Sequence, residues 1–151
     1  NNPRHLLRAL EAVRITGAPP ADHADDPPDY AAPEFVLMPS AELTRARIRR
    51  RTEQMLADGW IDEARALHER GLLQTPTARQ ALGYRTIIDW LEAGAGDGDA
   101  LLERLVIQTA QYAKRQRTWF RNQHTRARRL PVTADDTAAT LADRLLDAWR
   151  E

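Results

Sequence analysis

The sequence contains no cysteine and no long apolar run, and these absences exclude several classes of protein. Without cysteine, neither a disulfide framework nor a thiolate zinc site can form among its 151 residues. No stretch reaches the roughly 20 apolar residues that a membrane-spanning helix needs. No basic segment followed by an apolar one resembles a signal peptide. We therefore predict a soluble protein of the reducing cytoplasm, with no membrane partner.

Lysine is also nearly absent, and the 22 basic and 22 acidic residues leave a formal net charge of zero. This balance does not by itself indicate nucleic acid, but the charges are unevenly placed. Acidic residues gather in 22–29 and 97–99, whereas none interrupts 114–129. The basic residues of that segment are Lys114, Arg115, Arg117, Arg121, Arg126, Arg128 and Arg129. Because the planar guanidinium fork suits phosphate oxygens, this segment is a candidate anion-binding region.

The motifs of a self-sufficient active site are missing as well. The chain has no phosphate-binding loop of the type Gly-x-x-x-x-Gly-Lys-Ser/Thr and no Gly-x-Ser-x-Gly nucleophile turn. Its histidines, which are His5, His23, His68 and His124, do not have the spacing of metal ligands. The sequence therefore predicts no catalytic residue and no metal ligand in this chain.

Apolar periodicity and helix-boundary residues predict a mostly helical chain with one or two short strands. Asn2 and Pro3 can begin a helix that Gly17 ends. Further helices are predicted at 40–59, 60–70, 75–91, 99–121 and 134–149, and short strands at 35–38 and 130–132. Segment 18–33, rich in Pro, Asp and Ala, is predicted to be a flexible surface connection.

Two short strands cannot form a stable sheet alone. The simplest completion is a parallel sheet whose other strands belong to an absent amino-terminal half, which makes this chain the later part of an α/β core. The absence of an initial Met and the immediate helical pattern agree with truncation upstream. The length suits a single region, 1–151, better than two domains.

Three groups of residues are candidates for binding a phosphorylated partner. In 116–121 aromatic rings alternate with cations, a combination suited to stacking on bases while holding phosphates. Lys114, Arg117 and Arg121 fall on one helical stripe. The alternative is a solvated helix face with Trp119 and Phe120 in the core, and the residues alone leave both open.

The second group is Gly83-Tyr84-Arg85, which lies inside a predicted helix where Gly costs about 1 kcal/mol relative to Ala. Close approach of an RNA or of another helix would explain the missing side chain, with Gln80 and Arg85 as polar contacts. Tight helix packing with Tyr84 in the core is the alternative.

The third group is Arg4 and Arg8, one turn apart near a helix start, where the helix dipole favours an anion. A surface salt bridge to Glu11 is the alternative. A further basic run at 45–51 wraps all round its helix and is predicted to be solvated surface.

Several of these motifs, in this order, resemble those of the tRNA dimethylallyltransferase family. The motifs that carry the resemblance are Asn1-Asn2-Pro3-Arg4, Arg8-Ala9-Leu10-Glu11, Thr16-Gly17, the spaced set Leu43, Arg47-Ile48, Arg51, Met55, Gly59 and Glu63, then Gly83-Tyr84-Arg85, Tyr112-Ala113-Lys114-Arg115-Gln116 and Thr118-Trp119-Phe120-Arg121. Three positions depart from the family pattern: Asn2 replaces an Asp, His5 an Arg, and Glu53 an Asp. The departure at His5 weakens the first segment, because a guanidinium is lost there.

The resemblance implies transfer of a dimethylallyl group from dimethylallyl diphosphate to the exocyclic N6 of the adenosine beside the tRNA anticodon. It also implies a P-loop core with a helical insertion, Mg²⁺ on the diphosphate, and an adenine flipped into a channel. The family's phosphate-binding loop and general-base Asp lie upstream of the matching segment. This chain alone is therefore expected to be inactive, and the complete protein to be a monomer.

By position, the resemblance assigns tRNA contacts to three segments of this chain, the third being part of a basic helix and its extension at 99–129. The residues are Arg4, His5, Leu6, Leu7 and Arg8; Gln80, Ala81, Leu82, Gly83, Tyr84 and Arg85; and Lys114, Arg115, Gln116, Arg117, Thr118, Trp119, Phe120 and Arg121. The anticodon stem-loop is the expected partner. The alternative function is a non-catalytic helical module that binds RNA or protein. A helix-turn-helix DNA binder is a weaker reading, because no tight turn separates a short helix pair.

Overall fold

The computed structural model describes residues 3–18 and 33–150, which fall into two units, Asn1–Ala32 and Pro33–Glu151. The first unit contains helix α1 (Pro3–Thr16), which begins at Pro3 as predicted. It ends at Gly17, whose φ is +77° and whose N–H donates to Val13 O at 2.8 Å. The predicted connection at 18–33 lies, apart from its ends, outside the described residues.

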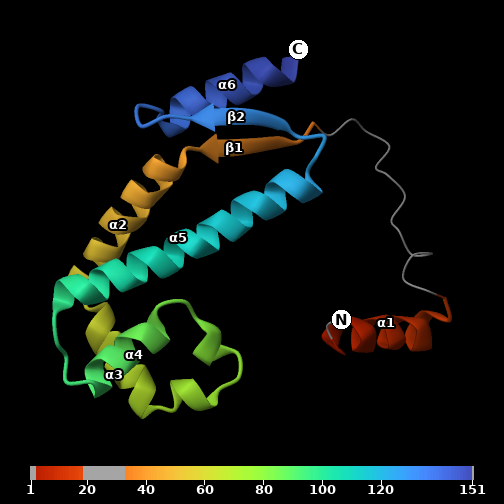
Figure 1. Cartoon of the computed structure of the whole chain (residues 1–151). Helices are drawn as coiled ribbons and strands as arrows, with labels where there is room; N and C mark the ends of the chain where they lie inside the picture. The colour runs from red at the N-terminus through yellow and green to blue at the C-terminus, as the bar shows by residue number, and fades with distance from the viewer. Residues whose placement is uncertain (1–2, 19–32, 151) are drawn as a thin grey trace. The chain divides into compact units, whose positions relative to one another are not determined.

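The second unit is mostly helical and contains a small parallel sheet, as the sequence predicts (Figure 1). Its elements are β1 (Phe35–Pro39), α2 (Ala41–Ala57), α3 (Trp60–Glu69), the 3₁₀ turns η2 (Leu72–Gln74) and η3 (Ala78–Gln80), α4 (Tyr84–Glu92), α5 (Gly98–Gln123), β2 (Arg128–Val132) and α6 (Ala138–Arg150). Within the described ranges, no helix has the length and apolar character needed to cross a membrane.

The sheet joins the two predicted strands directly. β1 and β2 run parallel, with Phe35 opposite Arg128 and Pro39 opposite Val132. Among the described residues these two strands form the whole sheet. Both strands therefore have their carboxyl ends at the same edge, the edge from which α2 departs.

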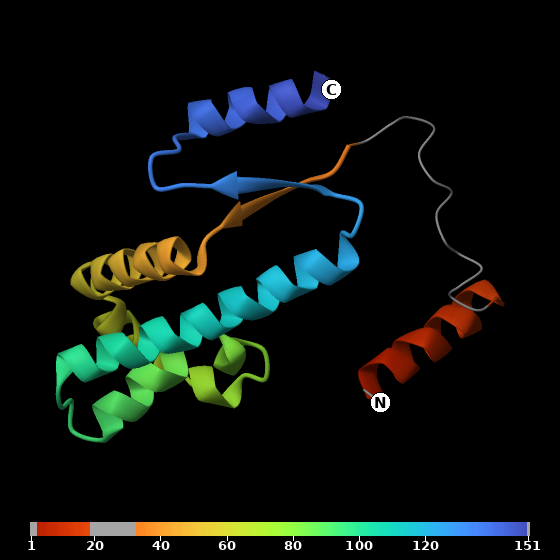
Figure 2. The same cartoon turned by 45° about the horizontal axis from the view of Figure 1, so that its top comes forward.

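Helices α2 and α5 form the frame of the second unit. Ser40 begins α2, because its hydroxyl accepts the N–H of Leu43 at 3.1 Å. In both views α5 lies between the strands and the α3–α4 pair (Figures 1 and 2). Arg45 and Arg49 of α2 both pair with Glu103 of α5. The prediction that the 45–51 run is solvated surface holds for Arg45, which is exposed, whereas Arg49 is half-buried beside an acidic partner that lies on a helix far along the chain.

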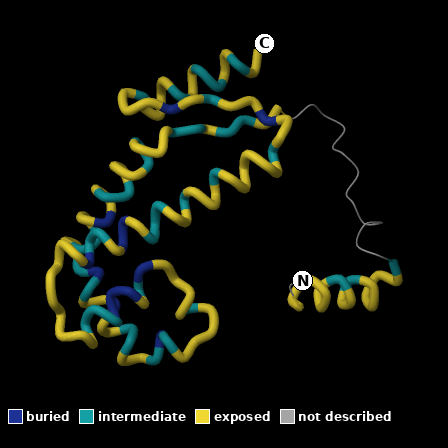
Figure 3. Tube along the Cα trace, in the orientation of Figure 1, coloured by how far each residue is buried: buried dark blue, intermediate teal, exposed yellow. Residues whose placement is uncertain are grey.

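The hydrophobic core lies at the end of the helical frame away from the strands (Figure 3). It contains Trp60, Ala64, Ile87, Leu101 and Leu105, all of which are buried. These side chains come from α3, α4 and the first turns of α5. The core therefore fixes α4 and the turn before it against α5.

The predicted continuous helix over 75–91 is wrong. The chain forms the 3₁₀ turn η3 there, and α4 begins only at Tyr84. Gly83 has φ +92°, which is outside the helical region and favours glycine. An ideal Cβ on Gly83 would lie 2.4 Å from the ring of Trp60. A side chain of helix α3 therefore lies directly against this glycine. This agrees with the prediction that another helix approaches it closely.

The final helix α6 begins four residues later than predicted, because the preceding turn has its own hydrogen bonds. Asp136 accepts the Thr133 N–H at 2.7 Å and binds Arg144 at 3.0 Å. The backbone hydrogen bond from Thr133, and then Arg144, hold the pKa of Asp136 below its ordinary value. Arg144 also donates to Pro131 O at 2.8 Å, and this contact ties α6 to β2.

Candidate nucleic-acid interface

The carboxy-terminal half of α5 exposes large aromatic side chains. Trp119 is 53% exposed and Phe120 is 41% exposed. Their rings meet edge to face with centroids 5.0 Å apart, and the His124 ring lies 5.1 Å from Trp119. In the part of the chain that the structure describes, neither ring is buried in the core. An exposed aromatic cluster of this kind offers faces on which bases can stack.

Cations surround this aromatic cluster. Lys114, Arg115 and Arg121 are exposed, and Arg117 is half-buried. The Arg115 guanidinium lies 5.7 Å from the centre of the Tyr112 ring, within cation–π distance. No acidic residue interrupts this part of the helix. The surface therefore combines positive charge with stacking faces.

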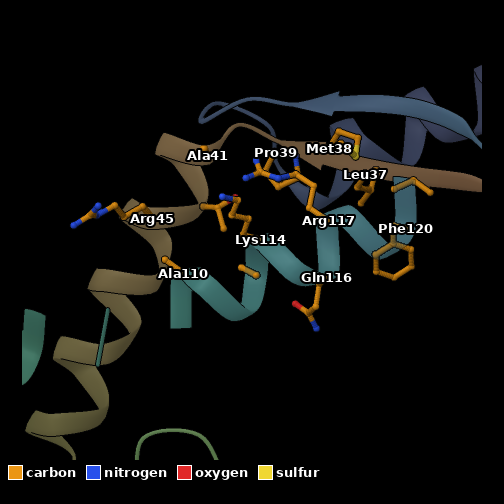
Figure 4. A pocket seen from close by; sticks show the side chains of 13 residues that line it. Leu37, Met38, Pro39, Ala41, Arg45, Ala110, Lys114, Gln116, Arg117 and Phe120 are labelled. Atoms are coloured by element: carbon orange, nitrogen blue, oxygen red, sulfur yellow. The ribbon is translucent and has the colours of Figure 1, made fainter. Parts of the chain in front are cut away.

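Two of these cations, Lys114 and Arg117, line a cavity of about 380 Å³, here called the strand-end cavity (Figure 4). It is enclosed by β1, the first turns of α2 and the carboxy-terminal half of α5. The lining residues are Val36, Leu37, Met38, Pro39, Ala41, Thr44, Arg45, Ala110, Ala113, Lys114, Gln116, Arg117 and Phe120. Lys114 and Arg117 extend from α5 on the side of Pro39, whereas Arg45 points away from them (Figure 4).

Local hydrogen bonds dominate the electrostatics of Glu42 at the start of α2. Hydrogen bonds from its own backbone and from the Ser40 hydroxyl hold the pKa of Glu42 below its ordinary value, and the charge of Arg117 adds to this effect. The amino-terminal end of α2 also carries the positive end of the helix dipole. The cavity therefore has an apolar lining from β1 and a positive edge from α5.

A second cavity of about 470 Å³, here called the turn cavity, lies between α2, α5 and the turn before α4. Its lining residues are Thr44, Ile48, Arg51, Thr52, Met55, Trp60, Leu82, Tyr84, Thr109, Tyr112, Ala113 and Gln116. Thr44, Ala113 and Gln116 border both cavities. Leu82 and Tyr84 come from the second predicted tRNA segment and Gln116 from the third, so the structure brings these two segments together.

The second segment is held in place by α3. Tyr84 packs edge to face on Trp60 at 5.8 Å and donates its hydroxyl to Glu63 at 3.1 Å. Burial, and then the hydrogen bond to Glu63, raise the pKa of the Tyr84 hydroxyl. The predicted polar contacts have partners inside the chain: Arg85 binds Asp89 at 3.0 Å, and Gln80 donates to Pro76 O at 2.9 Å.

The first segment lies on α1, in the other unit, and is described by itself. The side chains of Arg4, His5, Leu6, Leu7 and Arg8 are all exposed. Arg8 forms a salt bridge with Glu11 at 3.0 Å, which is the alternative that the sequence left open.

Sequence reasoning missed part of the lining of both cavities. Arg51 and Thr109 line the turn cavity, and Arg45 lines the strand-end cavity. Arg45 and Arg51 lie in a run that wraps its whole helix, so their spacing could not select them. Thr109 and Tyr112 precede Gln116 by seven and four residues, a helical spacing that could have placed all three on one face.

A metal site is not formed by the described part of the chain. In 3–18 and 33–150 no group of three or more His, Asp or Glu residues lies close enough together to hold an ion. The Mg²⁺ that the resemblance implies stays a prediction, and it was not assigned to residues of this chain.

Comparison with known proteins shows similarity along most of the chain. Residues 1–123 match the family described as IPP transferase. The tRNA dimethylallyltransferase of Mycolicibacterium gilvum is 39% identical over 154 aligned positions, covering 98% of this chain and 46% of the relative. That of Thermus thermophilus is 41% identical over 122 positions, covering 81% of this chain and 40% of the relative.

A solved structure shows the same fold. The full-length tRNA isopentenylpyrophosphate transferase of Bacillus halodurans superposes with a TM-score of 0.66 at 30% identity, over 99% of this chain and 45% of that protein. The chain thus spans less than half the length of the relatives it matches. It corresponds to one part of the fold of the solved relative.

Proposed function

Because the chain belongs to the IPP transferase family, we propose that it forms part of an enzyme that transfers a dimethylallyl group to tRNA. In the proposed reaction, N6 of the adenosine beside the anticodon forms a bond to the first carbon of the dimethylallyl group. The bond from that carbon to the diphosphate oxygen breaks, and diphosphate leaves. The proton lost from N6 passes to a base, which is proposed to lie outside the described residues.

The role proposed for this chain is to hold the anticodon stem-loop. The observation that carries it is the exposed surface of α5, where Trp119 and Phe120 lie among Lys114, Arg117 and Arg121. Stacking faces together with guanidinium groups suit the unpaired, phosphate-rich loop of an RNA hairpin. This surface is not the kind of site that holds a diphosphate, which would need a phosphate-binding loop or a bound divalent metal ion.

The remaining parts of the site are proposed to belong to the portion of the relatives that this chain does not match. They are a P-loop core that continues the β1–β2 sheet, the ligands of Mg²⁺, and the general base. The complete enzyme is proposed to be a monomer. Family membership favours this enzyme over a non-catalytic RNA-binding or protein-interaction module.

Binding of a synthetic anticodon stem-loop tests the proposed role. We expect this chain to bind a stem-loop with the substrate loop sequence about tenfold more tightly than one with the same stem and a scrambled loop, because unpaired bases contribute stacking energy. Fluorescence anisotropy with labelled RNA measures both affinities. Equal binding of the two hairpins would argue for the non-catalytic module.

A further inference from the structure

The His124 side chain connects the two exposed rings at the end of α5. The centroid of its imidazole lies 5.1 Å from that of the Trp119 ring and 5.5 Å from that of the Phe120 ring. Trp119 and Phe120 are consecutive residues of a helix, so their side chains leave it about 100° apart. The chain turns at His124, whose N–H still donates to Phe120 O at 3.0 Å. This turn lets one imidazole pack against both rings.

A carboxylate far along the chain holds this imidazole. His124 Nδ1 lies 3.1 Å from Glu34 Oε2, although the two residues are 90 positions apart. Because a carboxylate accepts hydrogen bonds, Nδ1 carries the hydrogen and donates it. The Glu34 backbone is fixed by the sheet, since its oxygen accepts the Arg128 N–H at 2.9 Å, where both strands begin (Figure 1). The hydrogen bond from His124 therefore ties the end of α5 to β1 and β2.

This connection limits the movement of rings that are otherwise exposed. An exposed aromatic side chain can change its rotamer, and a ligand that stacks on it must stop this motion at a cost in free energy. The His124 side chain is only 31% exposed, so most of its surface contacts the chain. A partly covered imidazole with a fixed hydrogen-bond partner can therefore order the two rings before a ligand binds.

We propose that His124, held by Glu34, is a positioning residue that keeps Trp119 and Phe120 in the orientation on which RNA bases stack. This inference rests on the proposed function, since the rings need a fixed orientation only if bases stack on them. Neither His124 nor Glu34 is proposed to contact a phosphate, and both act through the rings. Ordering two side chains before binding should raise the affinity for RNA about fivefold.

Two substitutions of Glu34 test the proposal in the whole chain, with binding of the matched anticodon stem-loop measured by fluorescence anisotropy. Glu34→Ala should weaken binding about fivefold, because it releases the imidazole. If charge alone mattered, removing a carboxylate beside a cationic surface would strengthen RNA binding, so the sign of the change separates the two explanations. Glu34→Gln removes the same charge but keeps an acceptor for the Nδ1 hydrogen, and its affinity should stay within about twofold of the wild type.

A double-mutant cycle tests whether Glu34 acts through His124. His124→Ala should cause the same loss of about fivefold, and adding Glu34→Ala to it should change the affinity by less than about twofold. The slope of log K against log salt should be the same in all of these variants, since no phosphate contact is removed. Urea unfolding of each variant establishes that the folded protein is being compared.

Glu69→Ala is the matched control, because it removes an exposed carboxylate of α3, a helix that packs at the end of the unit away from the strands. It should leave the affinity unchanged. Unchanged or tighter binding in Glu34→Ala, or a full further loss when it is added to His124→Ala, would refute the positioning role while the proposed function stands. Equal binding of matched and scrambled loops by the wild type would overturn the proposed function, and the variants would still decide whether the rings need His124. Failure of the wild type to bind either RNA would overturn both.

Discussion

Replacing Gly83 by Ala is expected to lower the free energy of unfolding by about 2–4 kcal/mol, the sum of backbone strain and overpacking. The φ of Gly83 is +92°, which an L side chain rarely adopts. The added Cβ would also lie 2.4 Å and 2.5 Å from two ring carbons of Trp60 and 3.3 Å from Leu105 Cδ2. The ring belongs to the core and cannot move without disturbing it. Urea unfolding of both proteins measures the difference.

Gly94 provides a matched control for this prediction. Its φ is also +92°, but a Cβ placed there would have nothing within 4 Å. Gly94→Ala should therefore cost only the backbone part, about 1 kcal/mol. Combining Gly83→Ala with Trp60→Phe, which removes the crowded atoms, should recover part of the loss that Gly83→Ala causes. Equal losses for the two glycine variants would show that the contact with Trp60 is unimportant.

Removing the three cations of the α5 stripe is expected to weaken binding of the anticodon stem-loop roughly 100-fold at low salt, because charge-assisted contacts to phosphates are lost. The variant replaces Lys114, Arg117 and Arg121 by Ala. It should also reduce the slope of log K against log salt by about 2, the value for three phosphate contacts on a single strand. Anisotropy titrations at several salt concentrations measure both quantities.

Arg104→Ala is the control for the charge effect, because Arg104 is an exposed cation nearer the other end of the same helix. It should leave both the affinity and the salt slope almost unchanged. A salt slope that stays the same in the triple variant would mean that these side chains do not contact phosphates. A similar loss in Arg104→Ala would indicate a general charge effect.

Helix boundaries could be predicted from the sequence where a local signal determines them. Ser40 caps α2 through a hydrogen bond three residues away, and the predicted stops at Gly17, Gly59 and Gly71 all coincide with positive φ. These signals act within a few residues, so they can be read along the chain. The parallel pairing of β1 with β2 was not predictable in the same way, because 88 residues separate the two strands.

The failures of prediction have a common physical cause, which is a contact between residues far apart in sequence. The predicted helix over 75–91 is interrupted because Trp60 occupies the space beside Gly83. The arginine run of α2 is partly paired because Glu103 of α5 lies next to it. Periodicity reports only on neighbours along one helix, so it cannot detect either contact.

The sequence indicated which segments belong to the candidate site, but not how their side chains are arranged in space. The motifs selected Gln80–Arg85 and Lys114–Arg121, and the structure brings these two segments together at the turn cavity. The exposure of Trp119 and Phe120 could not be decided from spacing, since either face of α5 could have faced the core. The roles of these residues in RNA binding stay predictions.

The most direct test of the account is steady-state prenyl transfer by a protein that joins this chain to the part of a relative that this chain does not match. With Lys114, Arg117 and Arg121 replaced by Ala, we expect KM for tRNA to rise at least about tenfold. KM for dimethylallyl diphosphate should stay within about twofold, because this chain is proposed to hold the RNA and not the diphosphate. An equal rise in both constants, or an unchanged KM for tRNA, would contradict the account.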